Sequence, residues 1–374
     1  MQSTTTGELL SLLRDRGPTS RAELARAIGV SAAALSKITA DLIARGQVSE
    51  VGGANRSQLG RPPVNIALNG DCCYLVGAHV GAGRVELVVT DILLNVLSRD
   101  RFTFPVDETS VDSLIERVGH AVNRLIEASG QYRNKFRGVG IGVPGSVDRG
   151  GRLNINAAFT HWHDIPFADR IEAIVGLPAV IEHNVTAIAL AEARFGVGRE
   201  YDTVLAVYMR AGLGGGFAHS GRNMRGRKHW GPVEIGHIVL DPRGGACRCG
   251  GKGCVETVFS ERPILERLGL DAVPEGGLMA AAMDQPAVWE PLYRPFLHAL
   301  ATAVTLIAPD LVVLGGHLGE APQRLLDDLR RDLPPRLMRQ LKGLKVDKVS
   351  LRPDAGAKGA ACVGLERFVY EGTG

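Results

Sequence analysis

The chain has 374 residues, of which 45% are hydrophobic and 22% are charged, and it carries a formal net charge of +3. This length and hydrophobic content allow two or three buried cores, so a multidomain organisation is expected. The N-terminus lacks a basic start followed by an apolar stretch, and no apolar run reaches the roughly 18 to 20 residues that span a bilayer. These features predict a chain with no secretory leader and no membrane span, and a cytoplasmic protein with no membrane partner is expected.

The first segment of the chain, residues 1–69, predicts three helices. Four leucines between residues 6 and 16 share one helical face, and Gly17-Pro18 ends that helix. Ser20 and Glu23 have the spacing of a capping box at the start of a second helix, which Gly29 ends. Ser31 caps a third helix whose apolar face is predicted to consist of Leu35, Ile38, Leu42 and Ile43.

The second and third predicted helices have helix-turn-helix spacing. In such a motif the N-terminal part of the later helix enters the major groove of DNA, where small polar side chains allow close approach and a lysine reaches a base edge or a phosphate. The residues predicted to face DNA are Ser31, Ala32, Ala33, Ser36 and Lys37. The alternative is a small helical bundle used for dimerisation.

Two short strands, QVSEV and VNIALN, are predicted to form a wing after the third helix. The loop between them ends in Gly60-Arg61-Pro62-Pro63, and its prolines hold the backbone extended. Arg61, with Arg56 near it, is therefore predicted to enter a narrow minor groove. Residues 1–69 contain eight Lys or Arg against five Asp or Glu, a net +3 that agrees with a polyanion partner.

From residue 71 onward the pattern is that of an α/β protein. Three successive strands (CCYLVGAHV, RVELVVTDI and NVLSRDRFTF), a helix over 111–129 and a buried strand (GVGIGVPG) form a first predicted unit, residues 70–184. A second unit, residues 185–374, repeats the outline with a glycine-rich hairpin (TVLAVYMRAGLGGGFAHSG), a helix over 286–307 and the strand DLVVLGG. Two such units suggest a ligand cleft between them, and the C-terminal helix is allowed to pack back on the first unit.

Four residues have the types and spacing of a closed tetrahedral zinc site: His237, Cys247, Cys249 and Cys254. Three thiolates and one imidazole leave no open position for a water molecule, which is typical of a structural rather than a catalytic metal. The alternative is a set of unliganded loop thiols. The other cysteines, Cys72, Cys73 and Cys362, lie in apolar stretches and are assigned no chemistry.

Several of these segments together resemble the ROK family, which groups bacterial sugar kinases with repressors. They are the wing with GRPP, the turn GVPGSVD, the run EIGHIVLDP followed by CRCGGKGCVE, and VVLGGHLG. The resemblance implies an N-terminal winged helix-turn-helix followed by a two-subdomain actin-like (ribonuclease H-like) ATPase fold, in which the two subdomains enclose ATP and a sugar.

The motifs expected of a kinase depart from the family pattern. The general base expected for the sugar hydroxyl falls on Asn184, which accepts no proton at neutral pH, so no catalytic residue is predicted. The first phosphate loop begins with His79 and ends with Arg84, without the acidic residue expected near the metal. His183 is the one substitute base to consider, and the run Gly212–Gly216 resembles the second phosphate loop.

The resemblance also implies a sugar pocket. Glu234, His237 and Glu256 match positions that contact sugar hydroxyls, and His183 with Asn184 complete the predicted effector site. Ala158-Phe159 before Trp162 departs from the family pattern, so a modified sugar, another small molecule or no ligand at all remain open.

The sequence thus predicts a DNA-binding transcriptional regulator, a repressor, that binds operator DNA as a homodimer or tetramer and senses a sugar or a related metabolite. Activation instead of repression stays open. The first alternative is an ATP-dependent sugar kinase with an attached DNA-binding domain. The second is a constitutive DNA-binding protein without a ligand.

Overall fold

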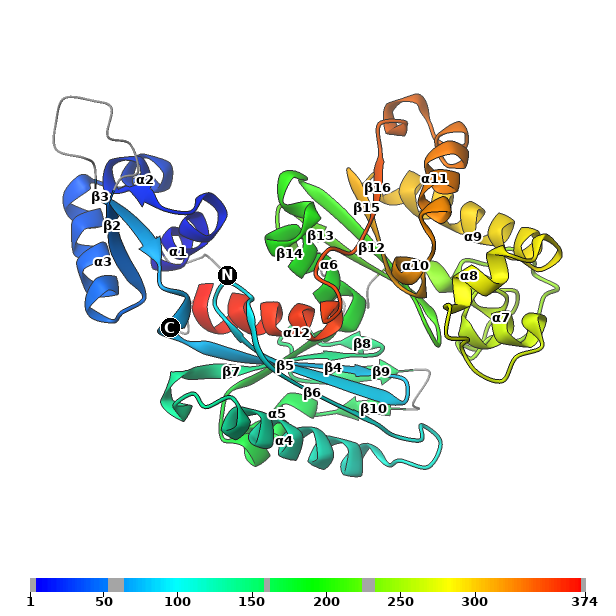
Figure 1. The fold of residues 1–374 in the computed structure, drawn as a ribbon, viewed down its shortest axis with the longest axis horizontal. Helices are drawn as coiled ribbons and strands as arrows, with labels where there is room; N and C mark the ends of the chain where they lie inside the picture. Colours follow the sequence, from blue (N-terminus) through cyan, green and yellow to red (C-terminus); the bar gives the residue numbers. More distant parts are fainter. Residues whose placement is uncertain (1–4, 53–63, 158–161, 224–232, 371–374) are drawn as a thin grey trace.

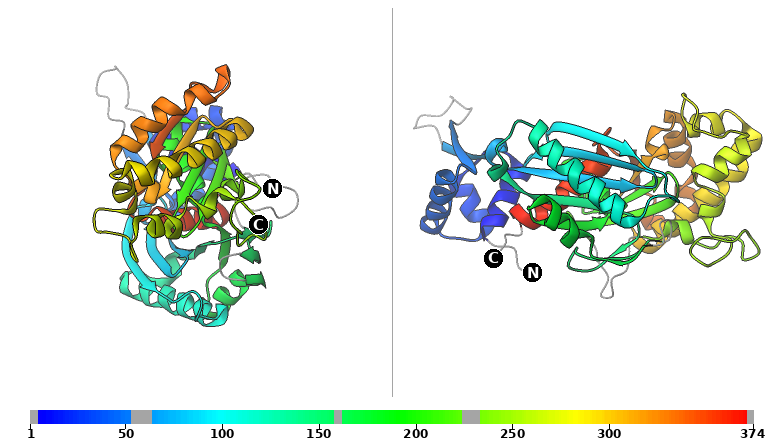
Figure 2. Two further views of the ribbon diagram at one scale, coloured as in Figure 1. Left: turned by 90° about the vertical axis from the view of Figure 1, so that its right-hand side faces the viewer. Right: turned by 90° about the horizontal axis from the view of Figure 1, so that it is seen from below.

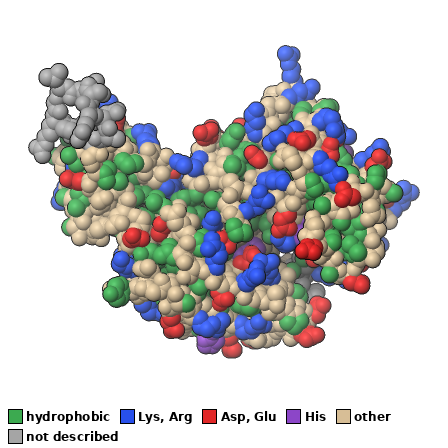
Figure 3. Space-filling view, in the orientation of Figure 1, with side chains coloured by type: hydrophobic (Ala, Val, Ile, Leu, Met, Phe, Trp, Pro, Cys, Tyr) green, Lys and Arg blue, Asp and Glu red, His purple; other side chains and the backbone are tan. Residues whose placement is uncertain are grey.

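The structure, a computed structural model, describes residues 5–52, 64–157, 162–223 and 233–370. A small N-terminal domain lies at one end of an elongated molecule, beside a body made of two lobes (Figures 1 and 2). The surface is hollowed between the N-terminal domain and the second lobe, which is the upper lobe in this view (Figure 3).

The N-terminal domain has the helices and the wing that the sequence predicts, with one added strand. Its elements are α1 (Thr5–Arg16), β1 (Thr19–Ser20), α2 (Arg21–Ile28), α3 (Ala32–Ala44), β2 (Val48–Gly52) and β3 (Val64–Leu68). Ser20 and Glu23 form the predicted capping box, and Gly29 ends α2 with a φ of 75°. The sheet order is β1-β3-β2, so the wing is a three-stranded sheet. The pairing of β1, only two residues long, was not predicted.

The first lobe contains a mixed five-stranded sheet of order β11-β7-β4-β5-β6. Its strands are β4 (Tyr74–Gly81), β5 (Arg84–Asp91), β6 (Val96–Thr103), β7 (Phe136–Val143) and β11 (Ala179–His183). Strand β5 pairs antiparallel with both β4 and β6, which confirms the predicted three-strand meander. Strand β7 pairs parallel with both β4 and β11. The helices α4 (Val111–Ala128) and α5 (Phe167–Val175) pack against this sheet. A small sheet of β8 (Ser146–Val147), β9 (Asn154–Ala157) and β10 (Trp162–Ile165) was not predicted.

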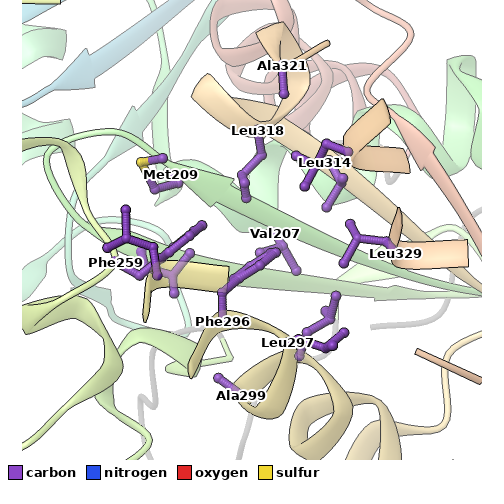
Figure 4. Packing of buried hydrophobic residues seen from close by; sticks show 14 of the residues in the cluster. Val207, Met209, Phe259, Phe296, Leu297, Ala299, Leu314, Leu318, Ala321 and Leu329 are labelled. Carbon is purple, nitrogen blue, oxygen red and sulfur yellow. The ribbon is translucent and has the colours of Figure 1, made fainter. Parts of the chain in front are cut away.

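The second lobe repeats this strand plan in the order β14-β13-β12-β15-β16. Its strands are β12 (Thr203–Met209), β13 (Leu213–His219), β14 (Arg222–Asn223), β15 (Leu311–Gly316) and β16 (Lys345–Lys348). Its helices are α7 (Glu261–Leu268), α8 (Leu278–Met283), α9 (Pro286–Ile307), α10 (His317–Glu320) and α11 (Gln323–Asp332). These helices pack on the sheet around the stacked rings of Phe259 and Phe296, whose centroids are 4.4 Å apart (Figure 4).

Two helices, α6 (Asn184–Phe195) and α12 (Ala355–Leu365), form a central layer between the two sheets (Figure 1). Helix α12 lies directly on β4 and β7, where a Cβ added at Gly140 would come within 1.8 Å of the carbonyl oxygen of Ala360. Only glycine permits this approach, and the small residues of α12 (AGAKGAACVGL) complete it. The last helix of the chain therefore covers the first lobe, and a boundary drawn at residue 184 does not separate two independent cores.

The N-terminal domain shares its hydrophobic core with the body. Leu9 and Leu13 of α1 belong to the same buried cluster as Leu190 of α6 and Cys362 of α12. The domain is therefore docked on the central layer by apolar contacts as well as by its linker.

Among the described residues, no single helix has the length and hydropathy needed to cross a membrane, and only the bent pair α2 and α3 meets that test when both are taken together.

Candidate functional site

The N-terminal end of α3 presents an exposed surface of small side chains, alanine and serine, and one lysine. Leu35 and Leu42 of this helix are buried and hold it against the N-terminal domain, whereas Ile38 and Ile43 are half-buried. All five residues that the sequence predicts to face DNA on this helix are exposed: Ser31, Ala32, Ala33, Ser36 and Lys37. The Oγ of Ser31 accepts a hydrogen bond from the backbone N–H of Ala34, so its hydroxyl also caps the helix. Arg56 and Arg61, the predicted minor-groove residues, lie outside the described residues.

The four predicted metal ligands lie together, with their candidate donor atoms all within 4.8 Å of one another. The Sγ atoms of Cys249 and Cys254 are 3.8 Å apart, and the Sγ of Cys247 is 3.6 Å from Nδ1 of His237. A tetrahedral ion with metal–sulfur bonds of about 2.3 Å and a metal–nitrogen bond of about 2.0 Å has sulfur–sulfur separations of about 3.8 Å and sulfur–nitrogen separations of about 3.5 Å. The cluster therefore has the dimensions of a four-coordinate metal site.

A tight loop brings the cysteines together. Gly253 has a φ of 69°, and a Cβ added there would lie 1.6 Å from the carbonyl oxygen of Asp241, so only glycine fits. A backbone hydrogen bond from Gly251 lowers the pKa of the Cys249 thiol. Burial raises the pKa of Cys254 to about 12, so this thiol ionises at neutral pH only where a cation compensates its charge.

Glu234 lies on the open side of this cluster. Its Oε2 is 3.8 Å from Nε2 of His237, whose Nδ1 faces the thiols, so the two ring nitrogens of His237 face different sites. Partial burial raises the pKa of Glu234, the imidazole of His237 opposes the rise and the carboxylate of Glu256 adds to it. A ring nitrogen and a carboxylate oxygen held side by side can hydrogen-bond neighbouring hydroxyl groups of a sugar.

Glu256 has a structural role that the sequence did not indicate. Its side chain is buried, and Oε2 accepts a hydrogen bond of 2.9 Å from the backbone N–H of Leu213, inside the glycine-rich hairpin. Glu256 thus joins the metal loop to that hairpin. Only the carboxylate lone pairs of Glu256 that do not bind Leu213 can accept hydrogen bonds from a ligand.

His183 and Asn184 mark the N-terminal end of α6, at the carboxyl end of β11. Nδ1 of His183 accepts from the backbone N–H of Thr186 at 3.4 Å, so the imidazole caps α6. Burial, together with repulsion from His79 when that ring is protonated, lowers the pKa of His183 to about 3. Nδ1 is the acceptor, so the neutral ring carries its proton on Nε2, which can donate to a ligand but cannot act as a base.

The imidazole ring of His79 is uncharged at neutral pH and lies near the guanidinium groups of Arg84 and Arg210. Its ring is buried, Nδ1 has no hydrogen-bond partner among the described residues, and the pKa is lowered to about 4 by burial and by the charges of Arg210 and Arg84. Arg84 is paired with Glu86 and Arg210 with Glu320, and His79 itself offers no carboxylate oxygen to a divalent cation.

A network of charged side chains that the sequence analysis missed lies at the carboxyl ends of β12 and β15. Nε2 of His317 is 2.6 Å from Oε2 of Glu261, its Nδ1 is 3.2 Å from Oε2 of Glu320, and Arg210 forms an ion pair with Glu320. Burial opposes protonation of His317, but the hydrogen bonds to both carboxylates raise its pKa. The network lies at the turn of Gly315-Gly316, within the segment VVLGGHLG that resembles the family, and nothing in the sequence indicated these charged contacts.

Trp162 is buried at the start of β10, where it packs on Phe167 with the ring centroids 5.8 Å apart. The neighbouring Ala158-Phe159, which depart from the family pattern, lie outside the described residues.

Comparison with known proteins agrees with the two-part architecture. The family model described as ROK family matches residues 75–366. A protein named putative xylose repressor, from Caldicellulosiruptor sp., is 27% identical over 343 residues, which cover 86% of this chain and 85% of the repressor. The glucokinase of Thermotoga maritima is 29% identical over 325 residues, but these cover 98% of the kinase and only 79% of this chain.

Among solved structures, a ROK family transcriptional regulator that is a homologue of the Escherichia coli MLC protein superposes with a TM-score of 0.82 at 23% identity. The superposition covers 98% of this chain and 96% of the regulator, so the regulator shares both the N-terminal domain and the lobed body.

Proposed function

Because this chain belongs to the ROK family, we propose that it is a DNA-binding transcriptional regulator, a repressor, whose kinase-like body senses a sugar or a related metabolite. The observation that carries the proposal is the exposed N-terminal end of α3 in a winged helix-turn-helix domain that the glucokinase relative does not share. Selection of bound duplexes from a random library, followed by genome-wide mapping of bound DNA, tests it. Failure to enrich any duplex would overturn the proposal.

Ala33→Glu is expected to weaken binding of the selected duplex at least about tenfold, because it places a carboxylate against the DNA phosphates. Ala33 is exposed, so the helix has room for the larger side chain. Fluorescence anisotropy at several salt concentrations measures the loss. Ala128→Glu, an equal charge change at an exposed position on α4, is the matched control and should leave affinity unchanged. Equal losses for both variants would argue against a role of α3.

We propose that the body is not a working kinase. Asn184 stands at the position of the base and has no basic atom, and the neutral nitrogen of His183 is occupied by the N-terminus of α6. The first phosphate loop contains His79 and Arg84, with Arg210 nearby, and has no acidic residue that could hold a metal. The charged side chains of the network around His317 are already paired with one another. These departures fall on different parts of the catalytic machinery, so no single substitution restores it.

No ATP-dependent phosphorylation of D-glucose, D-xylose, D-mannose or N-acetyl-D-glucosamine is expected, because loss of a general base alone costs about 10²- to 10⁴-fold. An ADP-coupled assay with Mg²⁺ measures this. Turnover that disappears in a His183→Ala variant would instead support the alternative function, an ATP-dependent sugar kinase with an attached DNA-binding domain.

We propose Zn²⁺ as the structural cofactor, held by His237, Cys247, Cys249 and Cys254. The donor set and the ligand separations fit this ion, and the proposed setting is the cytoplasm, where thiols stay reduced. When bound, the ion would stabilise the loop that carries Glu234 and Glu256. Metal occupancy would then set the shape of the effector pocket.

The proposed effector site is formed by Glu234, His237 and Glu256 on one side and by His183 and Asn184 on the other. The strand β13 connects the two groups, because Leu213 contacts Glu256 while Gly216 packs against the first turn of α6. A homodimer or tetramer would present two α3 helices to a pseudo-palindromic operator, one or more helical turns apart. A ligand changes this arrangement only through its different affinity for two conformations of the body.

A further inference from the structure

The docking of the N-terminal domain on the body includes one buried charge. Arg14 lies in the last turn of α1, and its side chain is 2% exposed. Its Nη1 is 3.1 Å from Oε1 of Glu366, in the π-helical turn η8 (Glu366–Tyr370) that follows α12, and its Nε donates to Oδ1 of Asp15 at 2.8 Å. A buried arginine is tolerated only with such partners, so its position is well defined.

Two aromatic rings from the body also contact Arg14. The guanidinium carbon is 4.7 Å from the ring centroid of Tyr370 and 5.4 Å from that of Phe195, distances at which a cation is attracted to an aromatic face. Tyr370 ends η8, and Phe195 is the last residue of α6. Arg14 therefore joins the N-terminal domain directly to the C-terminal end of α6.

Further contacts tie this end of α6 to the same place. Nη2 of Arg194 donates to Oε2 of Glu366 at 3.2 Å, so Arg194 and Arg14 share one carboxylate. Just beyond α6, Nη2 of Arg199 donates to the backbone oxygen of Asp15 at 2.9 Å. A shift of the end of α6 must therefore move α1 or break these contacts.

The opposite end of α6 lies at the proposed effector site. His183 caps this end and Asn184 is its first residue. The 12 residues of α6 contain neither glycine nor proline, so the helix is a rigid rod of roughly 18 Å. Its two ends thus connect the effector site with the docking contacts of α1.

We propose that α6 transmits the state of the effector site to the DNA-binding domain, and that Arg14 is the positioning residue that fastens the domain to α6. A ligand that favours one position of the cleft end of α6 would also favour one position of α1, and with it of α3. This inference rests on the proposed function, but its test needs neither a ligand nor DNA.

The test is a double-substitution cycle followed by amide hydrogen exchange on the full chain. His183→Ala removes the cap and loosens the cleft end of α6, and exchange is measured in α1, residues 5–16, with and without Arg14→Met. With Arg14 present, His183→Ala should raise α1 exchange at least about threefold. With Arg14→Met the increase should be clearly smaller, although Arg199 and the apolar contacts of α1 still join α1 to α6. Phe195→Leu, which leaves Arg14 in place, should uncouple the two ends in the same way and serves if Arg14→Met fails to fold.

Arg26→Met is the matched control, because Arg26 is an exposed arginine of the same domain whose Nε donates only within its own helix, to Ala22. The effect of His183→Ala on α1 should persist in this background. An equal effect of His183→Ala with and without Arg14, or no effect in either, overturns the proposal. If the wild-type chain enriches no DNA duplex, the proposed function fails, but the exchange cycle still decides whether α6 couples the two sites.

Discussion

Cys249→Ser is expected to abolish binding of the proposed Zn²⁺ and to destabilise the loop that carries Glu234 and Glu256. Serine is a poor ligand for zinc, and the separations among His237, Cys247, Cys249 and Cys254 leave no other donor to replace the lost thiolate within the cluster. Structural zinc sites contribute apparent binding free energies of about 10–16 kcal/mol in small peptides, so loss of a ligand should lower metal occupancy from one ion per chain to nearly none. Elemental analysis and thermal unfolding measure both effects.

Cys72→Ser is the matched control for this variant. Cys72 is half-buried and lies outside the metal cluster, near Cys73, so its replacement should leave metal content unchanged. Chelation of the wild-type metal should reproduce the lower thermal midpoint of Cys249→Ser. Full metal occupancy in Cys249→Ser would show that the four residues do not form the binding site.

Glu192→Gln is expected to destabilise the body by about 2–4 kcal/mol. The Glu192 side chain is completely buried in α6 and accepts hydrogen bonds from the backbone N–H groups of Ser350 (2.7 Å) and Leu351 (2.9 Å) and from the hydroxyl of Ser350 (2.7 Å). An amide replaces one acceptor oxygen with a donor that faces other donors, so buried polar groups are left unsatisfied. Urea unfolding at neutral pH, followed by circular dichroism, measures the loss.

Glu200→Gln, an equal charge change at an exposed position just after α6, should shift the urea midpoint little. Similar midpoints for Glu192→Gln and the wild type would show that the contacts of Glu192 with Ser350 and Leu351 contribute no net stability.

The features that the sequence predicted well depend on residues close together in the chain. The capping box of Ser20 and Glu23, the helix over 286–307 and the spacing of Cys247, Cys249 and Cys254 each lie within a short segment whose pattern is independent of the rest of the fold. Helix α3 belongs with them, since its apolar period of 3.6 residues also defines which side chains stay exposed.

The features that the sequence did not predict depend on contacts between distant segments. The two-residue strand β1 is defined only by its pairing with β3, and the ion pair of His317 with Glu261 joins residues that are 56 positions apart. Arg14 in α1 carries no local signal that its partners are Glu366 and Tyr370, near the other end of the chain.

The close packing of Gly140 against Ala360 has a consequence for biosynthesis. Helix α12 covers β4 and β7, yet it is the last regular helix before the end of the chain. While the ribosome is still translating the second lobe, one face of the first sheet has no cover and the docking partners of Arg14 in η8 do not yet exist. The N-terminal domain of the growing chain therefore cannot complete its docking on the body before η8 has been made, and a chain truncated before Ala355 leaves β4 and β7 without the cover of α12.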